Sequence, residues 1–83
     1  MGYSVYIADD EENVRELIRS FLESDGYAVT AFATGDGLMA AFEKQPSDLV
    51  ILDIMMPGTD GLTVCRRLRE RTTVPIILLT AKD

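Results

Sequence analysis

Acidic side chains follow two apolar segments of this chain. Asp9 and Asp10 come directly after segment 3–8, and Asp53 comes directly after segment 49–52. Short apolar segments of this kind are typical of strands, so each aspartate would stand at the carboxyl end of a strand. In an open parallel sheet these ends meet at one edge, where ligands bind. We therefore expect three carboxylates in one crevice.

Three neighbouring carboxylates repel one another, and a divalent cation relieves that repulsion. Mg²⁺ suits a site of this kind because it prefers oxygen ligands, usually one or two carboxylates together with waters and phosphate oxygens. An aspartate beside such a cation can attack phosphorus and form an aspartyl phosphate. Thr80 follows a further apolar segment, 74–79, and would add a hydroxyl group at the same edge.

Each of these residues also has a simpler interpretation. Asp10, which precedes two glutamates, could cap a helix, and Thr80 could merely end a strand. Asp53 is harder to explain in this way, since an unpaired charge inside an apolar strand costs several kcal/mol. Asp48 and Asp60 are expected to be turn and cap residues. The pattern favours a site role for Asp53 and leaves both alternatives open for Asp10.

The segments between these residues alternate between strand and helix patterns. Strands are expected at 3–8, 27–32, 49–52 and 74–79. Helices are expected where apolar residues recur every three or four positions: Val14, Leu17, Ile18, Phe21 and Leu22; Leu38, Met39, Ala41 and Phe42; Leu62, Cys65 and Leu68. Four strands alternating with three helices predict an α/β fold, a parallel sheet with helices on both faces.

Composition excludes several classes of function. The chain has 83 residues, which is one domain at most, and its net charge of −6 does not favour DNA or an anionic membrane. With no histidine and one cysteine, zinc sites built on those ligands, disulfide frameworks and histidine-based triads are excluded. No charge-free stretch, such as 72–81, approaches the roughly 20 residues of a membrane-spanning helix. We expect a cytoplasmic protein.

The remaining distinctive residues receive structural interpretations. Four arginines near the third predicted helix are expected to form a solvated face: Arg66, Arg67, Arg69 and Arg71. Cys65 is expected to be buried and inert. Met55 and Met56 are expected to line a loop rather than a cofactor site.

Three segments together resemble the receiver domain of bacterial two-component response regulators. They are IADDE at 7–11, DLVILDIMMPGTDG at 48–61 and PIILLTAKD at 75–83. The resemblance covers the whole chain and is greatest to regulators that carry a DNA-binding output domain. It implies a flavodoxin-like fold and a signalling module rather than a turnover enzyme.

The resemblance also implies a role for each site residue. Asp53 would be the phosphoacceptor, and Asp9, Asp10, Asp53 and the backbone carbonyl of Met55 would hold Mg²⁺. Thr80 would be the switch hydroxyl that turns toward the bound phosphoryl group. The donor would be a phosphohistidine on a sensor histidine kinase, with much of the docking surface supplied by the first helix.

By the same resemblance, residues 1–83 form an incomplete receiver. The fourth helix, fifth strand and fifth helix of the family would be absent, together with the lysine that pairs with the phosphoryl group. Lys82 does not replace that lysine, because it follows the fourth strand rather than the fifth. An alternative function is therefore a phosphorylation-incompetent piece that assembles into homo-oligomers through the exposed edge of strand 74–79.

A different enzyme class uses a similar aspartate. Hydrolases of the haloacid dehalogenase type also have a nucleophilic aspartate at a strand end, and they need a second aspartate two positions later as general acid. Met55 occupies that position here, so we do not favour this class. Neither nucleic acid nor membrane is expected to bind this chain directly.

Overall fold

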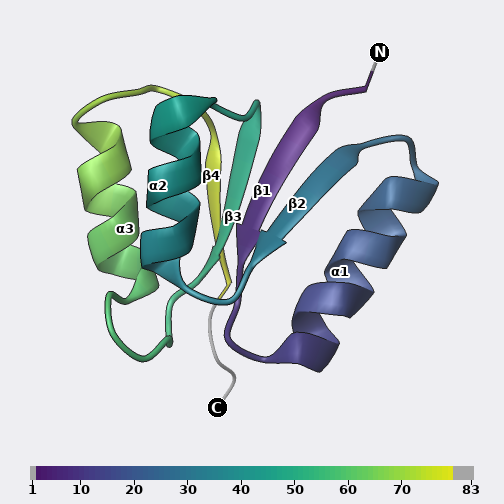
Figure 1. The fold of residues 1–83 in the computed structure, drawn as a ribbon, viewed down its shortest axis with the longest axis horizontal. Coiled ribbons are helices and arrows are strands. Elements are labelled where there is room, and N and C mark those ends of the chain that lie inside the picture. The colour runs from purple at the N-terminus through teal and green to yellow at the C-terminus, as the bar shows by residue number, and fades with distance from the viewer. Residues whose placement is uncertain (1, 80–83) are drawn as a thin grey trace.

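The computed structural model describes residues 2–79, in which four strands alternate with three helices (Figure 1). The elements, in chain order, are β1 (Ser4–Ala8), α1 (Glu12–Ser24), β2 (Ala28–Phe32), α2 (Gly35–Lys44), β3 (Leu49–Asp53), α3 (Gly61–Arg69) and β4 (Ile76–Leu79). The predicted order of elements is confirmed. Thr80, which was expected to provide the switch hydroxyl, lies outside the described residues.

All strand pairs in the sheet are parallel, and the strands lie in the order β2-β1-β3-β4. Helix α1 packs against β1 and β2, whereas α3 packs against β3 and β4 beside α2. The helices lie on both faces of the sheet, as Figure 1 shows. This arrangement confirms the predicted flavodoxin-like α/β fold. The chain reverses its direction of strand addition at β1, so the crevice between β1 and β3 is where ligands are expected to bind.

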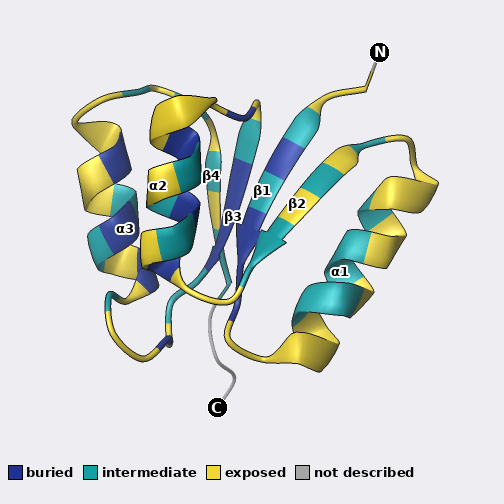
Figure 2. Ribbon diagram, viewed as in Figure 1, coloured by how far each residue is buried: buried dark blue, intermediate teal, exposed yellow. Residues whose placement is uncertain are grey.

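The two central strands are apolar throughout because each face of the sheet is covered. Val5, Ile7 and Ile51 form a cluster with side chains of α1. The alternate residues, including Val50 and Leu52, pack with side chains of α2 and α3. The dark blue segments of β1 and β3 in Figure 2 show this central burial. A strand buried on both faces has no polar side to alternate with.

Helix α1 buries less of its apolar stripe than the sequence predicted. Ile18 and Leu22 pack against the sheet, but Leu17 and Phe21 are 70% and 67% exposed. None of the residues in this helix is fully buried (Figure 2). The reason is geometric. Ile18 and Leu22 lie on the side of the apolar stripe that faces the sheet, whereas Leu17 and Phe21 lie on its other side, which no element within residues 2–79 covers.

Helix α3 is rotated relative to the face that the sequence predicted. Leu62 was expected in the core, yet it is 47% exposed, and Val64 is fully buried instead. Val64 and Leu68 are one helical turn apart and form the line along which α3 touches the sheet. Met56, which was expected to line a loop, is also buried in this core. Cys65 is half-buried against it.

Strand β4 is shorter than the predicted segment 74–79. It begins at Ile76, after Pro75, whose backbone has no N–H to contribute to the sheet. Ile77 is 47% exposed, so the face of β4 that carries this side chain is not fully covered. Among the described residues no helix is long and apolar enough to cross a membrane.

Gly61 allows α3 to start close to the end of β3. It is the buried first residue of the helix, and its N–H donates to the carbonyl of Ile54 at 3.1 Å. A Cβ at this position would run into the backbone of Asp53 and Ile54. Gly58, in the same loop, has φ of +78° but open space around it.

We expect Gly61→Ala to lower the free energy of unfolding by about 3 kcal/mol, the upper range for overpacking. Gly58→Ala is the matched control, and its left-handed backbone should cost only about 1–2 kcal/mol. Urea denaturation measures both values. Equal losses in the two variants would show that the close approach at Gly61 is not limiting.

Candidate metal centre

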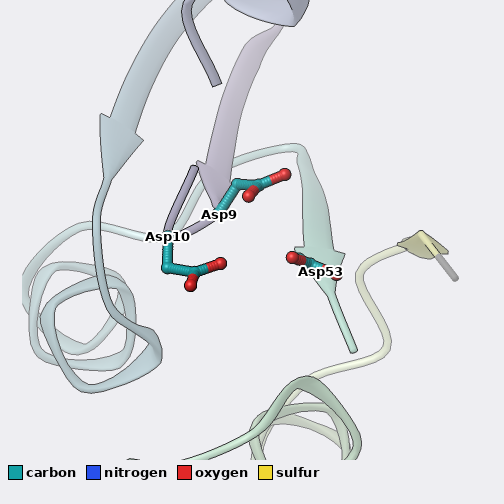
Figure 3. Close-up of side chains that lie close together, drawn as sticks. All are labelled: Asp9, Asp10 and Asp53. Carbon is teal, nitrogen blue, oxygen red and sulfur yellow. The ribbon is translucent and has the colours of Figure 1, made fainter. Parts of the chain in front are cut away.

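The parallel pairing of β1 and β3 brings three aspartates together. Ala8 of β1 lies opposite Leu52 of β3, so the residues that follow, Asp9 and Asp53, stand side by side at the edge of the sheet. Figure 3 shows the Asp9, Asp10 and Asp53 carboxylates around one space. One oxygen from each of the three lies within 4.8 Å of the others. The predicted convergence of these three residues is confirmed in geometry.

Asp9 is held by backbone groups and is almost entirely buried, with 3% of its surface exposed. Its Oδ1 accepts a hydrogen bond from the backbone N–H of Glu11 at 2.9 Å. The guanidinium of Arg15 donates to the backbone carbonyl of Asp9 at 2.8 Å. These bonds fix the strand-to-helix connection, and the arginine bond was not predicted because no spacing rule links a helix side chain to that carbonyl.

Asp10 is exposed and faces the other two carboxylates. The capping interpretation of this residue is wrong, because the N-cap position of α1 is Glu11, which makes no side-chain capping bond. Asp60 does cap α3 as expected, accepting from the N–H of Thr63 at 2.8 Å. Asp48 accepts from the N–H of Ser4 at 2.9 Å and so holds the start of β1.

Asp53 ends β3 and is half-buried, less enclosed than the apolar run before it suggested. Its Oδ1 accepts from the backbone N–H of Met55 at 3.2 Å, which orients the carboxylate. The Met55 side chain is 64% exposed. Its backbone carbonyl remains a predicted metal ligand, and the switch role of Thr80 likewise remains a prediction.

The cluster is electrostatically unfavourable without a cation. Burial raises the pKa of the Asp9 carboxyl, and the negative charges of Asp53 and Asp10 raise it further. The hydrogen bond from Glu11 opposes these effects by stabilising the ionised form. Within the described residues this is the only group of three or more potential ligands at metal-binding distances. Its donors are all oxygens, and its surplus of negative charge fits a hard divalent cation such as Mg²⁺.

We expect Asp9→Asn to be more stable than the parent protein at neutral pH without added metal. The raised pKa means that the folded protein binds a proton more readily than the unfolded chain, so stability falls as pH rises through the folded pKa. Asparagine removes this charge and keeps an oxygen that can accept from Glu11. The advantage should disappear below pH 3.8, where Asp9 is protonated in both states.

Thermal denaturation over a range of pH measures this effect, with Glu70→Gln as a control of equal charge change on an exposed position. A less stable Asp9→Asn protein at neutral pH would contradict the proposed repulsion.

Many known proteins are similar to this chain in sequence. The sequence matches the response regulator receiver domain over residues 5–83. It is 46% identical over 78 residues to the transcriptional regulatory protein ResD of Bacillus subtilis, covering 94% of this chain and 32% of that protein. It is 41% identical over 83 residues to the regulatory protein VanR of Enterococcus faecium, covering 100% of this chain and 36% of VanR. The chain therefore spans about a third of the length of these curated relatives.

Solved structures agree with the sequence matches. The response regulator TrrA of Thermotoga maritima, crystallised with Mg²⁺ and BeF, superposes with a TM-score of 0.91 at 39% identity, covering 100% of this chain and 72% of TrrA. The BeF3-activated receiver domain of RstA from Klebsiella pneumoniae gives 0.90 at 38% identity, covering 96% of this chain and 68% of that domain. With the sheet order and the three strand-end aspartates, these matches show that the chain belongs to the response regulator receiver domain family.

Proposed function

We propose that this chain accepts a phosphoryl group on Asp53 from a sensor histidine kinase, with Mg²⁺ as cofactor. The observation that carries the proposal is the approach of the Asp9, Asp10 and Asp53 oxygens to within 4.8 Å at the carboxyl ends of β1 and β3. Asp53 is the strand-end member whose carboxylate is both partly accessible and held by a backbone N–H.

The transfer step needs alignment and charge neutralisation rather than an internal acid or base. A carboxylate oxygen of Asp53 attacks the phosphorus of the donor phosphohistidine, and a new O–P bond forms. The P–N bond breaks, and its electron pair returns to the imidazole nitrogen of the donor. Residues 1–83 contain no histidine, so the donor phosphohistidine is not among them.

The metal would be held by Asp9, Asp10 and Asp53, with the Met55 backbone carbonyl as a further ligand. When bound, Mg²⁺ supplies positive charge that offsets the negative charge of the carboxylates and the phosphoryl oxygens. The N–H of Met55 restrains Oδ1 of Asp53 from the side of the loop. Thr80 is proposed as the hydroxyl that turns toward the phosphoryl group, on the strength of its place in the family motif.

We further propose that residues 1–83 serve as the receiver part of a cytoplasmic signalling pathway that regulates transcription, without turnover of a substrate. The support is the match to ResD and VanR, whose names describe regulatory proteins.

Incubation with acetyl phosphate and Mg²⁺, followed by intact mass spectrometry, should give one phosphoryl adduct on the parent protein. Asp53→Ala should give none, because the accepting oxygen is gone. Asp9→Asn should reduce the adduct by about tenfold or more, as expected for loss of one charged ligand near the reacting oxygens. Asp25→Asn, on an exposed residue at the end of α1, is the control.

Removal of Mg²⁺ with a chelator should also suppress the adduct in the parent protein. An adduct that persists in Asp53→Ala would place the acceptor elsewhere. No adduct on protein shown by circular dichroism to be folded would favour the alternative of a phosphorylation-incompetent assembly piece.

A specific observation favours self-association as a second function. β4 is the last strand of the sheet within the described residues, and Ile77 on it is 47% exposed. An unpaired apolar edge is a template for pairing with another chain. We propose that two copies associate through this edge and thereby remove Ile77 from water.

Sedimentation equilibrium should show dimers or larger species of the parent protein, and Ile77→Lys should weaken the association by more than tenfold. Burial of an isoleucine is worth about 1.5–3 kcal/mol, and lysine on an edge opposes strand pairing. Thr73→Lys adds the same charge on an exposed position just before β4 and should associate normally. A parent protein that is monomeric at all concentrations would rule this proposal out.

A further inference from the structure

A second hollow lies at the opposite end of the molecule from the aspartate cluster. It is a cavity of about 380 Å³ between the carboxyl-terminal halves of α2 and α3, which run side by side in Figure 1. Its principal lining residues are Met39, Phe42, Glu43, Arg67, Leu68 and Arg71. The volume falls in the usual range of small-molecule sites, about 300–1,000 Å³.

The inner wall of this cavity is apolar and firmly held. Phe42 and Leu68 are 6% and 4% exposed and belong to the core cluster between the sheet and α2 and α3. Tyr6 packs edge-on against Phe42, with ring centroids 6.2 Å apart. Met39 is half-buried beside them. The base of the cavity is therefore a fixed part of the core, and Met39 offers a partly accessible apolar side chain beside it.

The outer wall carries two guanidinium groups, on Arg67 of α3 and on Arg71 in the turn that follows the helix. Arg71 forms an ion pair with Glu43 of α2 at 2.6 Å, but both side chains are more than 60% exposed, so the pair contributes little and can rearrange. The guanidinium of Arg67 has no hydrogen-bond acceptor within residues 2–79. An arginine in this position offers a planar, two-point contact to a carboxylate.

Basic residues are concentrated at this end of the molecule, although the protein as a whole is acidic. Five of the eight basic residues lie at this end of α2 and α3: Lys44, Arg66, Arg67, Arg69 and Arg71. The net charge of −6 repels anions in general. Any preference of this cavity for an anion must therefore come from its own arginines and not from long-range attraction.

We propose that the cavity binds a small amphipathic carboxylate, a planar apolar body with one acidic group. The apolar body lies against Met39 and the exposed edges of Phe42 and Leu68. The carboxylate accepts hydrogen bonds from Arg67, with Arg71 as a second donor once it leaves Glu43. This site is separate from the proposed phosphoacceptor function and uses none of its aspartates.

The test uses 2-naphthoate as probe and 2-naphthamide as its neutral counterpart of nearly equal shape, titrated into the ¹⁵N-labelled 83-residue chain. Naphthoate should shift the amide signals of α2 and α3 around the cavity and bind at least about tenfold more tightly than the amide, the value of one charge-assisted contact. Arg67→Gln should remove this preference, because glutamine presents no cation.

Arg66→Gln is the matched control, since it removes the same charge from an exposed neighbour that does not line the cavity. It should keep the preference. The proposal is overturned if naphthoate shifts no signals at the cavity, if acid and amide bind equally, or if Arg66→Gln and Arg67→Gln weaken binding alike. Asp53→Ala should bind naphthoate normally, which separates this result from the outcome of the phosphorylation experiment.

Discussion

The parallel pairing of β1 with β3 is the constraint on which the site depends. Its register places Ala8 opposite Leu52, and the next residue of each strand is an aspartate. Both strands carry apolar side chains on both faces, so a shift of the register by one residue would still leave apolar side chains buried. The shift would, however, separate Asp9 from Asp53 along the edge of the sheet. Because Asp9 is buried beside two like charges, the core that aligns these residues also makes their ionised state costly. A bound cation would offset these negative charges, and relief of the repulsion would contribute to its affinity.

Backbone groups hold the carboxylates against their repulsion. The N–H groups of Glu11 and Met55 each donate to an aspartate oxygen, and each comes from the connection that follows a strand. Lysine or arginine donors in their place would neutralise part of the negative charge and weaken the attraction of the cluster for a metal ion. The close start of α3 at Gly61 brings the loop back against the end of β3. Asp9 and Asp53 are therefore each oriented by a backbone group of the connection that follows their strand.

The sequence predicted the site better than it predicted helix packing, and the reason is physical. A charged residue directly after an apolar strand marks a boundary that the chain cannot shift, so the residue pattern alone assigns Asp9, Asp10 and Asp53 to one edge of the sheet. A helix can rotate about its axis, and Leu62 and Val64 compete for the core with nearly equal hydrophobicity. Their competition is decided by the close contact of Gly61 with β3, which no local pattern reveals. The exposed positions of Leu17 and Phe21 depend likewise on what packs beside α1, a non-local property.

The separation of charge along the molecule follows from its topology. In a β-α-β chain every helix begins near the carboxyl edge of the sheet and ends near the amino edge, so the positive ends of the helix dipoles face the aspartates. The negative ends of α2 and α3 meet Lys44 and the arginines of the last turn of α3. Each set of side chains thus complements the dipole at its own end, and the acidic cluster and the arginines lie at opposite ends of the helices. The proposed anion site and the proposed cation site therefore share no residue and lie at opposite ends of the helices.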